Sequence, residues 1–323
     1  MHASNVMEND TLVHDLNQRY RLEFDRAESL QSELNDIKNS RWWPWFSKLR
    51  GLSSKLRSQP VIKIPEAPAV TTSTSVSMAE PFQLQTERTC STSQVSIVIP
   101  FRDQCELLER CVLPLHRTVP KAELVLVDNG SEQKQTKNFL HRCRISHGAQ
   151  IVHLDEPFNF SKLCNAGAAV VHRDILLFLN NDVMAMQPAW LEAMLEVISD
   201  SRVGVVGATL LYPDRTIQHA GLAPTGPNGT WVHPYRHQSD SHAGHQNELR
   251  RIRSVPAVTG ACLMIRRKLF EELQGFDHRY PVTMNDVDLC ERVRKCGLQV
   301  VITPFARLWH FESLSRGYAR EAA

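Results

Sequence analysis

Long hydrophobic runs are missing from this sequence. No segment approaches the roughly 20 consecutive apolar residues that a membrane-spanning helix needs. Residues 1–30 are polar and acidic and contain no hydrophobic core of a signal peptide. The eight cysteines include no Cys-x-x-Cys pair, and several lie in apolar or helical patterns, where a free thiol behaves as a small hydrophobic side chain. We therefore expect a reduced, cytoplasmic chain that is neither exported nor transmembrane.

An excess of charge of one sign is missing too. The chain has 37 Lys and Arg against 35 Asp and Glu, which gives a formal net charge of +2. Because the charges nearly balance, they provide no argument for a nucleic-acid partner, and we expect none. The 323 residues are 42% hydrophobic, as in ordinary globular proteins, and their composition changes near residue 95. This predicts one catalytic domain, residues 95–317, after an N-terminal appendage, with a short tail at 318–323.

The start of the chain has the pattern of an amphipathic helix. Within residues 8–40, apolar side chains recur at spacings near three and four among many charges: Leu16, Tyr20, Ala27, Leu30, Leu34 and Ile37. This predicts a helical or coiled-coil arm that binds a partner protein or forms a homo-oligomer.

Acidic residues are missing from residues 38–65, where lysines and arginines surround Trp42, Trp43 and Trp45. Tryptophan rings beside cations are typical of a segment that contacts a membrane surface. We therefore predict that residues 38–63 make peripheral contact with the inner face of the membrane. The alternative is that these tryptophans dock on the catalytic domain. The arm, residues 1–60, is followed by a predicted flexible linker at 61–94, rich in Thr, Ser, Pro and Ala.

Strand and helix patterns alternate after residue 94. Buried strands are predicted at 95–101, 123–127, 150–154, 175–179, 203–208, 255–265 and 299–303, and helices at 105–117, 133–144, 161–172, 188–199 and 286–296, with an irregular segment at 213–247. The first four strands and their helices have the βαβ rhythm of a doubly wound α/β sheet. Ligands of such a sheet bind at the carboxyl ends of its strands.

Acid and imidazole side chains stand at the ends of three apolar or helical segments. They belong to Leu-Phe-Leu-Asn-Asn-Asp at 177–182, Asn-Asp-Val-Asp at 285–288 and Leu-Trp-His at 308–310. Aspartate oxygens and a histidine nitrogen suit a divalent ion that carries a diphosphate, and a further aspartate is the simplest general base. The sequence therefore predicts metal-assisted group transfer.

Six motifs, in this order, resemble those of an inverting family 2 glycosyltransferase. They are Val-Ser-Ile-Val-Ile-Pro at 95–100, Val-Asp-Asn-Gly-Ser at 127–131, Phe-Asn-Phe-Ser-Lys-Leu-Cys-Asn-Ala-Gly at 158–167, Leu-Asn-Asn-Asp at 179–182, Asn-Asp-Val-Asp-Leu-Cys at 285–290 and Trp-His-Phe-Glu-Ser at 309–313. The resemblance covers about residues 95–317. It implies the GT-A fold of nucleotide-diphospho-sugar transferases, an α/β fold with a Rossmann-like mixed sheet.

The resemblance also implies a binding site for a nucleotide-sugar donor. Its expected residues are Pro100 and Arg102 beside the nucleotide, Asp128 on the base, Asn159, Lys162 and Asn165 near phosphate or ribose, Asn180 and Asn181 in the metal motif, and Thr259 and Gly260 under the sugar. A purely structural alternative stays open for several of them. Asp128 can begin a turn, and Asn159 can cap a helix.

Metal, base and acceptor residues follow from the same resemblance. Asp182 and His310 are the expected ligands of Mg or Mn, and Asn180 replaces the first aspartate of the family's Asp-x-Asp. Asp286 is the expected catalytic base, and it can also cap a helix. Asp288 is expected to support the loop or touch the acceptor, and Trp231 to stack on a sugar.

The resulting hypothesis is metal-assisted, inverting transfer of a sugar to a hydroxyl of a growing cell-surface glycan or a lipid-linked acceptor. A sugar-phosphate nucleotidyltransferase would need a glycine-rich phosphate loop after the first strand, and residues 100–103 are Pro-Phe-Arg-Asp. A catalytically inactive glycosyltransferase-like scaffold is the other alternative, because Asn180 and Asn285 stand where the family has acids.

Overall fold

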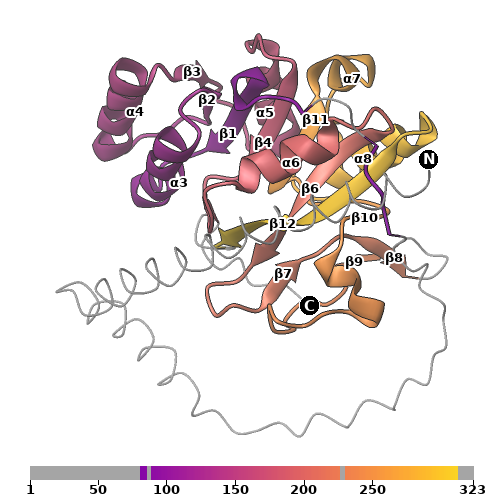
Figure 1. The fold of residues 1–323 in the computed structure, drawn as a ribbon. Helices are drawn as coiled ribbons and strands as arrows, with labels where there is room; N and C mark the ends of the chain where they lie inside the picture. Colours follow the sequence, from indigo (N-terminus) through magenta and orange to yellow (C-terminus); the bar gives the residue numbers. More distant parts are fainter. Residues whose placement is uncertain (1–80, 86–88, 226–229, 312–323) are drawn as a thin grey trace, which may run out of the picture. The chain divides into compact units, whose positions relative to one another are not determined.

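The computed structural model describes residues 81–85, 89–225 and 230–311 (Figure 1). The arm at 1–60, residues 61–80 of the linker and the tail at 318–323 lie outside these described residues. The described residues form a ten-stranded sheet in the order β10-β12-β6-β11-β4-β1-β2-β3, with β5 paired to β12 and β7 to β6. A separate hairpin contains β8 (Ala223–Thr225) and β9 (Thr230–Val232).

One half of the large sheet is parallel. Its strands are β1 (Val95–Phe101), β2 (Glu123–Asp128), β3 (Gln150–His153) and β4 (Ile175–Leu179). β1 and β4 are mostly apolar and buried throughout, as expected of strands that are covered on both faces, whereas β3, at the end of the sheet order, is only partly buried. This half has the arrangement that the alternating strand and helix pattern predicts.

The other half makes the sheet mixed. β11 (Cys262–Arg266) lies antiparallel between β4 and β6 (Val203–Leu211), whereas β12 (Gln299–His310) runs parallel to β6. Two predicted strand boundaries were wrong by seven residues each, and the strand predicted to end at residue 208 continues to Leu211. The strand expected from residue 255 begins only at Cys262, and the one expected to end at residue 303 continues through a register shift to His310. The mixed sheet is the one implied by the GT-A resemblance.

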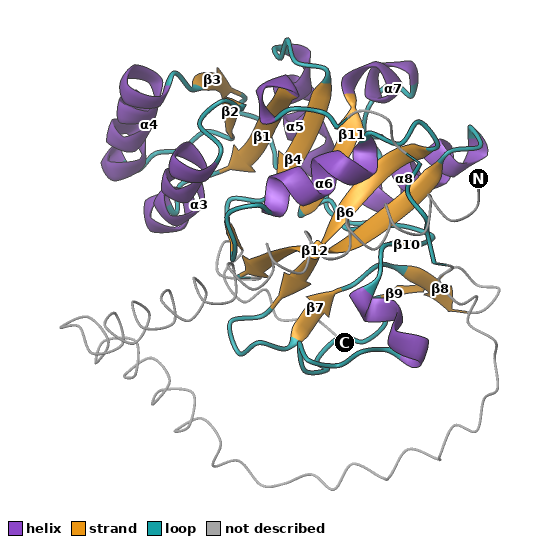
Figure 2. Ribbon diagram, in the orientation of Figure 1, coloured by secondary structure: helices purple, strands orange, loops and turns teal. Residues whose placement is uncertain are grey.

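Helices cover both faces of the sheet (Figure 2). One face carries α3 (Cys105–Thr118), α4 (Lys134–His147) and α6 (Trp190–Ile198), and the other carries α5 (Phe160–Ala169), α7 (Arg267–Glu272) and α8 (Asn285–Lys295). The alternation of side chains along a strand divides the core accordingly. In β4, Leu177 belongs to the core with α3, α4 and α6, whereas Phe178 belongs to the core with α5, α7 and α8.

Helix α5 lies unusually close to the sheet at one glycine. A Cβ on Gly167 would lie 2.4 Å from Val98 Cγ1 and 2.8 Å from Val127 Cγ2. Only a residue without a side chain allows α5 to approach β1 and β2 this closely.

The segment expected to be irregular, 213–247, contains short elements. They are β7 (Ile217–His219), the β8–β9 hairpin and the first part of the 3-10 helix η2 (His245–Arg250). In Figure 1 these elements lie together below the central strands of the large sheet, to which β7 is joined through β6, and near β10 (Arg253–Ser254). They form the layer from which side chains reach the end of β12.

The described part of the predicted linker contacts the domain. Phe82 N–H donates to Ile252 O at 3.0 Å, and Gln85 N–H donates to the Asp200 carboxylate at 2.8 Å. Residues 92–94 form the 3-10 helix η1 (Thr92–Gln94) directly before β1. The packed part of the chain therefore begins before residue 95.

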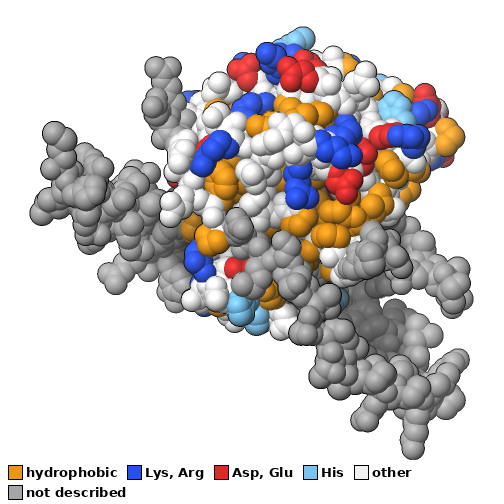
Figure 3. All heavy atoms as spheres, turned by 90° about the vertical axis from the view of Figure 1, so that its right-hand side faces the viewer, with side chains coloured by type: hydrophobic (Ala, Val, Ile, Leu, Met, Phe, Trp, Pro, Cys, Tyr) orange, Lys and Arg blue, Asp and Glu red, His pale blue; other side chains and the backbone are white. Residues whose placement is uncertain are grey.

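The face of the protein shown in Figure 3 carries lysine and arginine side chains interspersed with acidic ones, and hydrophobic side chains gather between them. Among the described helices, none combines the length and the apolarity that crossing a membrane requires.

Candidate active site

Side chains from distant parts of the sequence line one pocket of about 360 Å³. Seven of the predicted site residues lie there: Asn180, Asp182, Trp231, Thr259, Gly260, Asp286 and His310. Asn180 and Asp182 follow β4, Thr259 and Gly260 precede β11, and Trp231 lies in β9. Asp286 lies at the start of α8, and His310 is the last residue of β12. The carboxyl end of β4 is thus the edge at which the three polar segments of the sequence meet.

Asp182 and His310 form one wall of this pocket. His310 Nε2 lies 3.2 Å from Asp182 Oδ1, and the two residues are only 7% and 5% exposed. Pairing of β5 (Val183–Ala185) with β12 sets His310 opposite Val183, and Phe311 N–H donates to Asp182 O at 2.9 Å. The backbone itself therefore holds these side chains together.

The Asp182–His310 pair fits a divalent ion. Neighbouring ligands of an octahedral ion, each about 2.1 Å from the metal, lie about 3.0 Å apart, close to the observed separation. One oxygen and one imidazole nitrogen suit Mn or Mg. Within the described residues, no group of three or more His, Cys, Asp or Glu side chains could hold a metal. An ion here would therefore take further oxygens from water, from an amide such as that of Asn180 or from a bound ligand.

Asp286 forms another part of the pocket wall, at the N-terminus of α8. Its Oδ2 accepts the Gly260 N–H at 2.9 Å, and its Oδ1 accepts the Val287 N–H at 2.9 Å. Burial raises the pKa of Asp286, whereas these N–H groups oppose the rise. The result is a carboxylate with an oriented side chain and a stronger affinity for a proton than an ordinary aspartate.

Asn285, which replaces an acid of the family motif, lines the pocket beside Asp286 and is tied to the preceding loop. It is 3% exposed, and its amide donates to Tyr280 O at 3.3 Å. The amide therefore holds the loop that leads into α8. Asp288 accepts two hydrogen bonds from Arg292, at 2.9 and 2.6 Å, and does not line the pocket.

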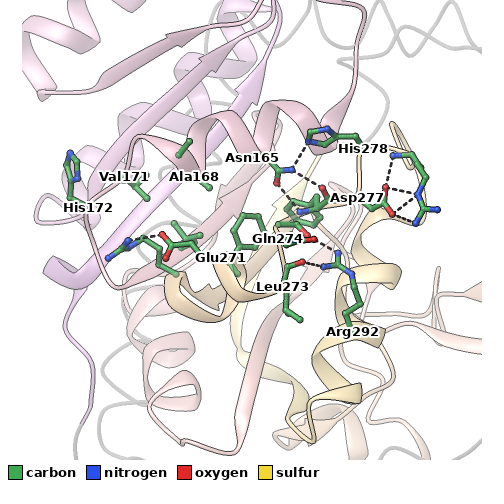
Figure 4. A pocket seen from close by; sticks show the side chains of 17 residues that line it. Asn165, Ala168, Val171, His172, Glu271, Leu273, Gln274, Asp277, His278 and Arg292 are labelled. Carbon is green, nitrogen blue, oxygen red and sulfur yellow. Dashed lines mark hydrogen bonds and ion pairs between the residues drawn. The ribbon is translucent and has the colours of Figure 1, made fainter.

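The 158–167 motif anchors the loop before Asp286. Asn159 caps α5 by accepting the Lys162 N–H at 3.0 Å and donates to His278 O at 2.9 Å. Asn165 accepts the Phe276 N–H at 2.9 Å, donates to Phe276 O at 2.8 Å and lies 2.8 Å from His278 Nε2 (Figure 4). The structure places neither asparagine in the 360 Å³ pocket, so their expected contact with phosphate or ribose stays a prediction.

The other predicted nucleotide contacts also lie outside this pocket. Asp128, 3% exposed at the end of β2, accepts the Ser131 N–H at 2.9 Å and lies 3.1 Å from His153 Nδ1. The Ser131 contact forms the turn that was its structural alternative, and the His153 contact joins β2 to β3.

Four further predicted residues are not brought into the pocket. Lys162 pairs with Glu156 at 2.6 Å, and Arg102 with Glu132 at 3.4 Å. Pro100 is buried within β1, and Asn181 is buried beside the pocket residues Asn180 and Asp182. Their roles toward a nucleotide remain predictions.

A second, larger hollow of about 810 Å³ lies between α5, α7 and the 274–279 loop (Figure 4). Its charged side chains pair with one another or with immediate neighbours, in Arg267–Glu271, Arg279–Asp277 and Arg292–Asp288. Of the predicted site residues, only Asn165 lines it. The smaller pocket is therefore the candidate active site.

Gln218 is a pocket residue that the sequence pattern did not reveal. Its Oε1 lies 2.8 Å from His310 Nδ1, although 92 residues separate the two in sequence. A single glutamine in a strand of three residues carries no recognisable signal. Only the contact with a predicted metal ligand marks it.

The fold and the site define the class. A mixed α/β sheet with an Asp–His pair and an opposing aspartate at the end of its central strands is the arrangement of nucleotide-diphospho-sugar transferases with the GT-A fold. The chain belongs to glycosyl transferase family 2, whose model matches residues 96–274. The family and fold implied by the sequence motifs are therefore confirmed.

Relatives in bacteria are similar over the same domain. An uncharacterized protein, y4gI, of Sinorhizobium fredii is 38% identical over 70% of this chain and 25% of its own length. The O-antigen biosynthesis protein RfbC of Myxococcus xanthus is 37% identical over 70% of this chain and 18% of its own. An N-acetylglucosaminyl-diphospho-decaprenol L-rhamnosyltransferase of Mycobacterium tuberculosis is 30% identical over 45% of this chain and 49% of its own. The chain thus spans half or less of the length of these curated relatives.

Solved structures share the fold. GalNAc-T7 with UDP, GalNAc and Mn²⁺ matches with a TM-score of 0.55 and 17% identity, over 67% of this chain and 43% of that chain. The mannosyltransferase PcManGT from Pyrobaculum calidifontis, in complex with GDP-Man and Mn²⁺, matches with a TM-score of 0.51 and 18% identity, over 70% of this chain and 58% of that chain.

Proposed function

We propose that this protein is an inverting glycosyltransferase. It transfers a sugar from a nucleotide-diphosphate-sugar to a hydroxyl of a growing cell-surface glycan or a lipid-linked acceptor, with the help of Mg or Mn. The observation that carries the proposal is the 360 Å³ pocket, which joins the Asp182–His310 pair to Asp286. Membership of glycosyl transferase family 2 supports it.

Asp182 and His310 would hold the divalent ion. When bound, the ion neutralises the negative charge that gathers on the departing diphosphate. Asn180 lines the same pocket and can hydrogen-bond ribose or a metal-bound water through its amide. The two structural relatives described with Mn²⁺ support a divalent ion of this kind.

Asp286 would act on the acceptor. Its carboxylate takes the proton of the acceptor hydroxyl while that oxygen forms a bond to the anomeric carbon. The bond from this carbon to the diphosphate breaks, and the nucleoside diphosphate leaves with the electron pair. One base on the face opposite the leaving group is sufficient for inversion. Trp231, which lines the pocket in β9, is placed to pack against a sugar ring.

The acceptor class rests on two relatives. One is named for O-antigen biosynthesis, and another for transfer to a diphospho-decaprenol-linked sugar. We infer a related glycan or lipid-linked glycan as acceptor here. A lipid-linked acceptor would lie at the membrane, which fits the proposed contact of residues 38–63 with its inner face. Residues 8–40 would bind a partner protein or a second copy of the chain.

Ligand binding tests the donor side. A thermal-shift panel of nucleoside diphosphates and nucleotide-sugars, each with and without Mn²⁺, should give one that raises the melting temperature more when Mn²⁺ is present. Asp182→Ala should remove that additional gain and leave the metal-free shift unchanged. Binding that ignores Mn²⁺ in the unaltered chain would contradict the metal role. Metal-dependent binding with no transfer to any glycan acceptor would favour the inactive scaffold.

A further inference from the structure

Strand β7 contains an irregularity beside the candidate active site. In the pairing of β7 with β6, His219 lies opposite Leu210 and Ile217 lies opposite Leu211. Gln218 is therefore an extra residue, a β-bulge, with no paired residue in β6. Such a bulge redirects the side chains of a strand, which otherwise point to opposite faces in turn. Here the neighbouring side chains of Gln218 and His219 both reach residues that line the 360 Å³ pocket.

Gln218 defines which nitrogen of His310 carries the ring proton. An amide oxygen only accepts hydrogen bonds, so the 2.8 Å contact requires His310 Nδ1–H to donate to Gln218 Oε1. Nε2, which is 3.2 Å from Asp182 Oδ1, is then the nitrogen whose lone pair is available to a cation. A hydrogen-bond partner on the other nitrogen is the usual support of a metal-binding histidine.

His219 supports the opposite wall of the pocket. It is 0% exposed, and its Nε2 accepts the backbone N–H groups of Gly221 and Thr259, each at 3.3 Å. Backbone N–H groups only donate, so Nε2 carries no proton, and Nδ1–H donates to His233 Nδ1 at 3.0 Å. Burial lowers the pKa of His219, and the nearby His233 and Arg253 lower it further, in keeping with a neutral ring.

Thr259 connects His219 to the proposed base. The next residue, Gly260, donates its N–H to Asp286 Oδ2 at 2.9 Å. A shift of the peptide that His219 holds would therefore move the donor that orients the Asp286 carboxylate.

We propose that Gln218 and His219 are positioning residues for the two halves of the site. Gln218 holds His310 with Nε2 ready for the metal, and His219 holds the Thr259–Gly260 backbone against which Asp286 is oriented. The effects on metal binding and catalysis that we infer for these residues rest on the proposed function. Both hydrogen-bond roles, however, can be measured without catalysis.

The first test compares Gln218→Leu with Gln218→Glu in the full chain. Glutamate keeps an acceptor oxygen and leucine removes it at similar size. We expect the leucine variant to bind Mn²⁺ at least about tenfold more weakly, measured as free ion by electron paramagnetic resonance, and the glutamate variant to stay near the unaltered chain. Equal Mn²⁺ affinity in the leucine variant would overturn the role of Gln218.

A nuclear magnetic resonance measurement keeps this test separate from the proposed function. In the metal-free chain, two-bond proton–nitrogen spectra should show His310 protonated at Nδ1, and Gln218→Leu should shift the ring toward the other tautomer. If the unaltered chain fails to bind Mn²⁺, the metal role fails while the tautomer result still decides the inference. A ring protonated only at Nε2 would overturn it.

The second test compares His219→Gln with His219→Asn. The glutamine oxygen can replace Nε2 as acceptor, whereas asparagine reaches only the position of Nδ1. We expect the Thr259 amide to exchange with solvent at least about tenfold faster in the asparagine variant, corresponding to loss of one hydrogen bond. The kcat should fall with it, while Mn²⁺ affinity stays unchanged. Equal exchange of Thr259 in the two variants would overturn the role of His219.

Discussion

Asp286 combines two opposing influences on one carboxylate. The Gly260 and Val287 N–H groups stabilise its ionised form, whereas burial destabilises that form and raises the pKa overall. A general base benefits from both effects, because the N–H groups fix its orientation and burial increases its affinity for the proton.

Replacing Asp286 with Asn should remove the base while keeping the size and shape of the side chain. The single amide oxygen of asparagine can still accept the Gly260 N–H, but it cannot take a proton and cannot also accept the Val287 N–H. We expect kcat to fall by at least about a hundredfold and nucleoside diphosphate affinity to change little. Steady-state kinetics and calorimetric titration measure the two effects. A variant with full activity would exclude Asp286 as the base.

The same substitution should stabilise the fold in a pH-dependent manner. Because the pKa of folded Asp286 is raised, the folded state holds this proton more tightly than the unfolded state, and ionisation costs stability above the folded pKa. Asp286→Asn should therefore gain stability relative to the unaltered chain as pH rises through the folded pKa, and this gain should fade as pH falls through it. Melting temperatures across pH measure it. A gain that is constant with pH would point to a cause other than charge.

At the level of elements, α5 serves as the support for the loop that leads into α8. Besides the Asn159 and Asn165 contacts, Phe160 N–H donates to Pro281 O at 2.7 Å, and Ser161 Oγ donates to Tyr280 O at 2.8 Å. The α5 helix is itself packed closely against β1 and β2 at Gly167. A motif expected to bind the donor thus holds the loop that precedes Asp286, the proposed base.

Asn165→Ala separates these two roles. If Asn165 anchors the loop, its loss leaves the Phe276 backbone groups without their partner, which should cost about 1–3 kcal/mol of unfolding free energy and lower kcat. Nucleoside diphosphate affinity should stay the same. Urea unfolding and titration measure the two quantities, with Ala169→Ser on the exposed side of α5 as a control. A selective loss of nucleotide affinity would instead support the donor contact.

At the scale of the whole molecule, the catalytic domain should be independent of the N-terminal arm. The described residues contain two large hydrophobic clusters, one on each face of the sheet, and both are built from residue 82 onward. For membrane contact, the sequence offers the basic, tryptophan-rich segment at 38–63 as a candidate outside this domain.

Deleting residues 1–60 tests this division. We expect the melting temperature of the domain to change little and the fraction that sediments with anionic liposomes to drop several-fold, because tryptophan and basic side chains are what binds such surfaces. Replacing the three tryptophans by serine in the full chain provides the matched variant. Unchanged sedimentation together with a lower melting temperature would support docking of the tryptophans on the domain.

Much of the fold could be predicted because it rests on local patterns. The apolar runs of β1 and β4 and the helical spacing of α3 and α5 are properties of neighbouring residues, and they matched the structure within a few positions. The antiparallel insertion of β11 and the extension of β12 to His310 could not be read in this way, since both depend on which strands pair. For the site, the motifs indicated Asp182, Asp286 and His310, whereas Gln218 and His219 carried no signal.

The sequence by itself determined the family, the order of the main strands and helices and the types of side chain available to the site. Motifs and periodicity are properties of short stretches of chain, so they can be recognised without the structure. Only the tertiary structure decided that Asp182, Asp286 and His310 share one pocket, that Asn165 bonds a loop and that the β7 bulge brings Gln218 to His310. These outcomes depend on contacts between residues that are distant along the chain. Their geometry is fixed by strand pairing and packing, which no local pattern specifies.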